Sequence, residues 1–211
     1  MRTQTLFRIW ASLFFLLLTI AGLSSFNDSG TIKLWMEKDK LNWSDFQGKL
    51  DKQVLAENHV KQSEDMNTEE GIRHTETAAY CSHSISFQSW YENGMITYEV
   101  KTLFNKLKSW KNTQSAYILN HEQRHFDLAE VHARMLRKYL NDSVSKFDRQ
   151  MQNKIMSRFM QLDNEAQVDY DEATQHSELP DKQEEYDAYI DSLLKEYAAY
   201  AEPRFIVKIG K

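Results

Sequence analysis

The sequence predicts an α+β domain in which a small antiparallel sheet precedes a helical half. Apolar and polar residues alternate through most of residues 79–104, a pattern typical of half-buried strands. From about Thr113 onward the spacing of apolar residues lengthens to between three and four, which is typical of helices. Because the strands come first and the helices follow, the predicted class is α+β.

The first 24 residues are predicted to be an export signal. Residues 1–8 contain two arginines and no acidic residue, and residues 9–23 are mostly apolar. Gly22 and Ser24 place small residues where a signal peptidase cuts. An uncleaved N-terminal anchor is the alternative, although the apolar run is shorter than the roughly 20 residues of a spanning helix. We therefore expect residues 25–211 to form a single secreted or periplasmic domain.

The composition excludes several classes of protein. The chain has 211 residues, of which 41% are hydrophobic, enough for one domain with a substantial core. Its net charge is -5 and no long block of Lys or Arg occurs, so we expect no nucleic-acid partner. Cys81 is the only cysteine and cannot form an internal disulfide. Because Cys81 alternates with Ile85 and Phe87, it is predicted to be a small buried residue.

Two strands are predicted over residues 79–90 and 95–104, joined by Glu92-Asn93-Gly94. Asn-Gly is a strong hairpin signal because both residues tolerate positive φ. A strand followed by a turn is expected over residues 31–48, and residues 205–209 are short and β-prone.

Three helices are expected in the second half. Thr113 or Ser115 can cap the first, which runs to about Leu140. Asp181 can cap the third, just after Pro180. The apolar stripe of the second helix comprises Phe147, Met151, Ile155, Phe159, Leu162 and Ala166. The apolar side of the third is expected to carry Tyr186, Tyr189, Ile190, Leu193, Tyr197 and Tyr200.

The first helix contains the pentad His121-Glu122-Gln123-Arg124-His125, a His-Glu-x-x-His pattern. Residues four apart on a helix share one face, so both imidazoles can bind a single zinc ion. Glu122 lies about 100° around the helix from His121, where it can face a water on the metal. Zinc lowers the pKa of such a water towards 7, and a neighbouring carboxylate can take its proton. The pentad therefore predicts two zinc ligands, His121 and His125, and a catalytic base, Glu122. A solvated helix face that carries two histidines is the alternative.

A third ligand has to come from outside the pentad. His132 is about 10 Å along the helix axis from His125, too far for one ion. Glu130 points away from His121.

Residues 170–176 (YDEATQH) are the best source of the third ligand. If the first two helices are antiparallel, this segment returns to His121. His176 is the preferred third ligand and Asp171 is the alternative. Tyr170 is a candidate donor of a hydrogen bond to the oxyanion that forms in the transition state.

Four blocks of the sequence resemble domain-of-unknown-function family 922, described as predicted secreted zinc-dependent proteases. The blocks are residues 41–48 (LNWSDFQG), 108–110 (KSW), 120–130 (NHEQRHFDLAE) and 170–176 (YDEATQH). The resemblance implies a zincin-like metallopeptidase, with His121 and His125 as ligands and Glu122 as catalytic acid/base. The family pattern has a glycine after its last histidine, where this chain has Ser177.

Our first hypothesis is an exported zinc-dependent endopeptidase that binds one Zn²⁺ and a protein or peptide substrate. The substrate would pair with the edge of the hairpin sheet as an added strand. A non-catalytic exported binding module, with a structural metal or a packed histidine pair, is the first alternative. A zinc amidase acting on cell-wall peptide is the second, with the same metal chemistry and another substrate.

Overall fold

A computed structural model describes residues 30–49, 78–143 and 146–209 of the chain. The predicted export signal, residues 1–24, lies outside these ranges. The described residues from Thr31 onward form one compact unit. The described part has antiparallel sheets in its first half and three helices in its second, which confirms the predicted α+β class.

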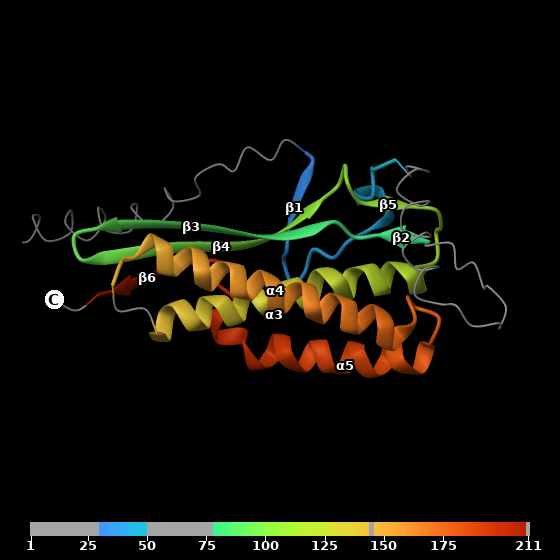
Figure 1. Cartoon of the computed structure of the whole chain (residues 1–211). Helices are drawn as coiled ribbons and strands as arrows, with labels where there is room; N and C mark the ends of the chain where they lie inside the picture. Colours follow the sequence, from blue (N-terminus) through green and yellow to red (C-terminus); the bar gives the residue numbers. More distant parts are fainter. Residues whose placement is uncertain (1–29, 50–77, 144–145, 210–211) are drawn as a thin grey trace, which may run out of the picture. The chain divides into compact units, whose positions relative to one another are not determined.

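The main sheet is built around one long hairpin (Figure 1). Strand β4 pairs with β3 along one side and with β1 and β6 along the other, always antiparallel. A separate ribbon pairs β2 with β5. The strands are β1 (Ile32–Leu34), β2 (Ala79–Tyr80), β3 (His83–Glu92), β4 (Met95–Asn105), β5 (Trp110–Lys111) and β6 (Arg204–Lys208).

The predicted turn joins β3 to β4. Asn93 and Gly94 both have left-handed backbones, with φ of 51° and 77°, as a two-residue hairpin turn requires. The strand expected over residues 79–90 is interrupted after Tyr80, however. Ser82 donates its backbone N–H to the Ser109 hydroxyl at 2.9 Å. β2 thereby leaves the main sheet and pairs with β5.

Helix α3 (Ala116–Ser143) lies at the centre of the unit (Figure 1). It packs against β3 and β4 of the sheet and also against α4 (Arg149–Thr174) and α5 (Pro180–Glu196). The core between sheet and helices contains Ile96, Tyr98 and Val100 of β4, alternate residues as the strand period predicts, together with Leu136 and Leu140 of α3.

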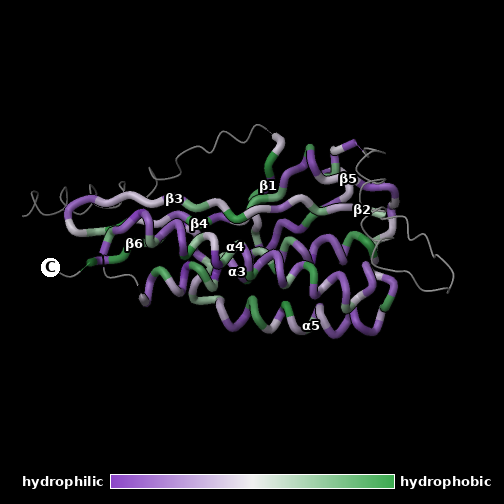
Figure 2. Tube along the Cα trace, viewed as in Figure 1, coloured by the Kyte–Doolittle hydropathy of each residue, from purple (hydrophilic) through white to green (hydrophobic). Residues whose placement is uncertain are grey.

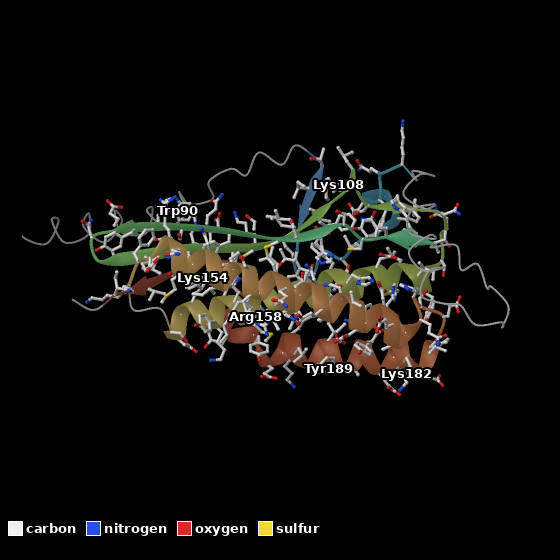
Figure 3. The ribbon with its side chains drawn as sticks, in the orientation of Figure 1. Trp90, Lys108, Lys154, Arg158, Lys182 and Tyr189 are labelled. Atoms are coloured by element: carbon white, nitrogen blue, oxygen red, sulfur yellow. The ribbon has the colours of Figure 1, made fainter. Side chains whose placement is uncertain are left out.

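The start of α5 and its buried face differ from the prediction. The helix begins at Pro180 with Leu179 at the N-cap, so Asp181 lies in the first turn and is not the cap. Ile190 is fully buried, but Tyr189 is 54% exposed. Figure 3 shows Tyr189 on the side of α5 away from the sheet. Successive helical residues are about 100° apart, so Tyr189 and Ile190 cannot face the core equally.

Charged residues are also buried in the middle of α3. The Glu130 carboxylate accepts hydrogen bonds from Arg134 Nε at 3.0 Å, Arg137 Nη1 at 2.8 Å and the Thr102 hydroxyl at 2.7 Å. Arg137 also donates to the carbonyl of Val100 at 2.8 Å. Each buried charge therefore has partners, and Glu130 is engaged away from the pentad histidines.

Two of the blocks noted in the sequence meet at a loop. Gly48 donates its backbone N–H to the carbonyl of Ser109 at 2.7 Å, which joins residues 41–48 to residues 108–110. A Cβ on Gly48 would lie 2.7 Å from that carbonyl oxygen and 2.8 Å from the one of Leu107. Glycine is therefore required by the close approach of the two backbones.

The described helices mix hydrophilic and hydrophobic residues along their length (Figure 2). None of them combines the length and the apolar character that crossing a membrane requires.

Candidate metal centre

His121 and His125 converge with Asp171 near the start of α3. The two Nε2 atoms are 3.2 Å apart. Asp171 Oδ1 lies 3.1 Å from Nε2 of His121 and 3.0 Å from Nε2 of His125. Asp171 belongs to the last turns of α4, which runs back alongside α3. The expectation that residues 170–176 return to the pentad is therefore confirmed.

The spacing of these three atoms fits a metal ion. Tetrahedral zinc with bonds of 2.0–2.1 Å places its ligand atoms about 3.3–3.4 Å apart, and one face of an octahedral ion about 3.0 Å. The observed separations of 3.0–3.2 Å lie between the octahedral value and the tetrahedral one. Within the described ranges, this is the one group of His, Cys, Asp or Glu found with such spacing. Two imidazoles and a carboxylate are also donors that zinc accepts.

His176, the preferred third ligand in the sequence, does not belong to this group. Its side chain is 51% exposed, and its Nδ1 lies 3.5 Å from Asp171 Oδ1. The structure thus brings the alternative, Asp171, to the histidines and leaves His176 at the rim. Asp171 lies within α4, whereas His176 follows the end of the helix at Thr174.

The turn after α4 has an unusual backbone. Gln175, His176 and Ser177 have φ of 48°, 51° and 72°, all in the left-handed region. Glycine adopts this region without steric cost. Ser177 thus occupies a backbone position that favours glycine.

Glu122 is buried beside the two histidines, with 5% of its surface exposed. Burial raises the pKa of its carboxyl, while His125, His121 and a backbone hydrogen bond from Cys81 oppose that rise. A raised carboxyl pKa suits a group that takes up and releases a proton near neutral pH. Cys81 itself is buried, as predicted.

Asp171 and His125 form a charged pair. Burial lowers the pKa of His125, but the hydrogen bond to Asp171 and its negative charge outweigh this effect and raise the pKa to about 9. Burial works against ionisation of Asp171, yet hydrogen bonds from His121 and His125 hold its pKa well below the usual range. At neutral pH His125 is therefore protonated, and its positive charge balances the negative charge of Asp171.

We expect a metal ion to bind this group more tightly as pH rises, because an ion has to displace this proton. His125 is protonated below its pKa of about 9, so the affinity for a divalent ion such as Zn²⁺ should increase roughly tenfold per pH unit between pH 6.5 and 8.5. Competition titrations with a chelator of known affinity measure this slope. A pH indicator should detect about one proton released per ion bound at pH 7.5. An affinity that does not change with pH would contradict the assignment.

Tyr170 is placed differently from its predicted role. The side chain is fully buried, and its hydroxyl donates to Gln183 Oε1 at 2.8 Å. Its ring stacks on that of His121, with centroids 4.7 Å apart. A buried hydroxyl that already has a partner is not available to a substrate oxyanion. The structure therefore does not support the oxyanion role, and Tyr170 instead packs against His121, a candidate ligand.

Two glutamines that sequence reasoning did not identify contact the histidines from outside. Gln167 Oε1 lies 2.6 Å from Nδ1 of His125, and Gln183 Oε1 lies 2.9 Å from Nδ1 of His121. Their only signal in the sequence is a glutamine four residues from an aspartate on the same helix, a spacing that permits a hydrogen bond but is common.

His83 and His132 form a second buried cluster with Asp163. His83 Nε2 lies 3.3 Å from Asp163 Oδ2, and His132 Nδ1 lies 3.3 Å from Asp163 Oδ1. Both histidines are thus paired, and neither joins the candidate metal centre.

Comparison of the chain with protein-family models, curated proteins and solved structures gave no match. The fold and the site together define a class, an α+β protein with a candidate His-His-Asp metal centre. The resemblance to family 922 stays a prediction.

Proposed function

We propose that this protein is an exported zinc-dependent endopeptidase. His121, His125 and Asp171 would hold the ion, and Glu122 would act as general acid and base. The observation that carries the proposal is the convergence of three donor atoms at 3.0–3.2 Å, two from α3 and one from α4, beside a buried carboxyl on α3. A His-Glu-x-x-His helix with this donor set favours zinc over the Fe(II) that such a set also suits.

A zinc ion at such a centre acidifies water and polarises a carbonyl group. The chain's own contribution is proton transfer and positioning. Glu122 takes the proton of the attacking water and returns it to the leaving nitrogen, so the carboxyl ends the reaction as it began. The raised pKa of the Glu122 carboxyl favours both steps, because the group can then both accept and release a proton near neutral pH.

An extended peptide is the substrate that the surroundings of Glu122 suggest. Within the described ranges, β3 pairs with β4 alone, so its other edge offers main-chain hydrogen bonds. The chain enters β3 through Cys81, whose backbone bonds to Glu122. A peptide strand added at this edge would pass the general base. Recognition would then depend mainly on the substrate's main chain.

The donor set supports a catalytic ion rather than a structural one. A structural zinc is normally closed by four protein ligands, whereas a catalytic zinc keeps one position open. Among the described residues the group has three members. Asp171, the most exposed of them at 29%, marks the side that solvent can reach. These observations favour the enzyme over the non-catalytic binding module.

Metal removal tests the proposal. The purified full-length protein should contain about one zinc per chain and cleave a reduced, alkylated protein. Dialysis against a chelator should abolish cleavage, and one equivalent of Zn²⁺ should restore it. Cell-wall fragments, assayed in parallel, distinguish the amidase, which would release stem peptides and leave the protein substrate intact. Protein that binds no metal, or that cleaves equally after chelation, would overturn the proposal.

A further inference from the structure

Each candidate ligand histidine is bonded by a glutamine that is itself held by an aspartate. We propose that Gln167 and Gln183 are positioning residues that fix both imidazoles with hydrogen on Nδ1 and with Nε2 directed at the metal. The inference rests on the proposed function for its role in metal binding. The geometry of the two glutamines stands on its own contacts.

The orientation of the Gln183 amide is determined by Asp187. Gln183 Nε2 donates to Asp187 Oδ1 at 2.7 Å. An ionised carboxylate only accepts hydrogen bonds, so the amide NH₂ has to face Asp187 and the amide oxygen has to face His121. Asp187 is fixed in turn by Asn120 Nδ2 at 2.7 Å and Arg124 Nε at 3.1 Å. Since an amide oxygen cannot donate, the hydrogen lies on Nδ1 of His121.

Gln167 is held in the same way on the other histidine. Its Nε2 donates to Asp163 Oδ1 at 3.0 Å and to the backbone carbonyl of His125 at 3.1 Å. Its Oε1 then accepts from Nδ1 of His125. Asp163 cannot turn away, because His83 and His132 also contact its two oxygens.

These contacts decide which nitrogen of each ring can bind metal. A neutral imidazole with hydrogen on Nδ1 has its lone pair on Nε2. The two Nε2 atoms and Asp171 Oδ1 already meet at 3.0–3.2 Å. The glutamines therefore remove the freedom of each ring to flip or change tautomer before the ion arrives. Loss of such an outer hydrogen bond typically lowers metal affinity about tenfold to hundredfold.

The pentad itself supplies a matched control. Gln123 Nε2 donates to Asp127 Oδ1 at 2.7 Å, the same pairing one turn apart on a helix. Its Oε1, however, accepts from the backbone N–H of Leu41 at 2.7 Å and contacts no histidine. Gln123 is buried like Gln183, so its loss should weaken the fold without reaching the metal.

The first experiment replaces Gln167, Gln183 and Gln123 by methionine, one at a time, in the full-length chain. We expect Gln167→Met and Gln183→Met to lower Zn²⁺ affinity about tenfold to hundredfold and to change the visible spectrum of bound Co²⁺. Gln123→Met should lower the thermal midpoint of the metal-free protein but keep the Zn²⁺ affinity and the Co²⁺ spectrum of wild type. Equal affinities in all three variants would overturn the inference.

Nitrogen NMR of the metal-free protein, recorded at a pH where the spectra show both histidines to be neutral, tests the tautomers without any metal. Hydrogen should lie on Nδ1 of both ligand histidines in wild type, and Gln183→Met should abolish this preference at His121. Tautomers that are mixed in wild type would overturn the inference. Fixed tautomers in a protein that binds no zinc would instead overturn the proposed function and leave the positioning role standing.

Discussion

Glu122→Gln is expected to abolish peptide hydrolysis while the protein keeps its zinc. Glutamine has nearly the shape of glutamate and its amide oxygen can still accept the backbone hydrogen bond from Cys81. It cannot take up a proton, however. General acid–base catalysis contributes roughly a hundredfold to ten-thousandfold, and we expect kcat to fall about a thousandfold. KM should change little, because no ligand or substrate-binding edge is altered.

The measurement combines kcat on an extended fluorogenic peptide with metal analysis of the same preparation. Glu165→Gln removes the same charge from an exposed position on α4 and should leave kcat within about twofold of wild type. Loss of zinc together with activity would assign Glu122 to the metal rather than to the proton. Full activity in Glu122→Gln would remove the general base from the mechanism.

The sequence predicts those residues of the candidate metal centre that lie on one helix, α3. His121 and His125 share a face because of the helical repeat, and Glu122 follows from the same geometry. The hairpin is likewise local, since Asn93-Gly94 determines both turn and register. These features need no knowledge of how distant segments pack.

The choice between Asp171 and His176 depends on tertiary packing. An antiparallel α4 brings both residues back to the pentad. The helix direction alone cannot tell which of two residues five positions apart reaches the histidines. The end of α4 and the left-handed turn at residues 175–177 decide the outcome. The placement of Tyr170 depends on packing in the same way, because its hydroxyl turns inward to Gln183 and its ring lies against His121.

Gln167 and Gln183 show a different limit of sequence reasoning. Glutamine and aspartate four residues apart are common on exposed helical faces. Their meaning here depends on which ring nitrogen each amide oxygen meets, and that follows only from the packing of three helices. The matched pair at Gln123 and Asp127 has the same spacing and contacts no histidine.

Asp171→Ala is expected to reduce zinc affinity by more than a hundredfold and to abolish hydrolysis. It removes one of the three proposed ligand atoms, so we expect a larger loss than the tenfold to hundredfold typical of an outer hydrogen bond. It also removes the negative charge that raises the pKa of His125. Fewer protons should therefore be released per ion when a high zinc concentration saturates the weakened site. Both effects are measured in one competition titration with a pH indicator.

His176→Ala is the comparison that decides the third ligand. His176 is half exposed and its Nδ1 lies 3.5 Å from Asp171 Oδ1, so we expect zinc affinity to change less than tenfold. If His176 were the ligand and Asp171 only its orienting partner, the order of the two losses would reverse. We expect the larger loss for Asp171→Ala, because Asp171 Oδ1 already contacts both Nε2 atoms. The imidazole of His176 would have to move inward from a left-handed turn to do the same.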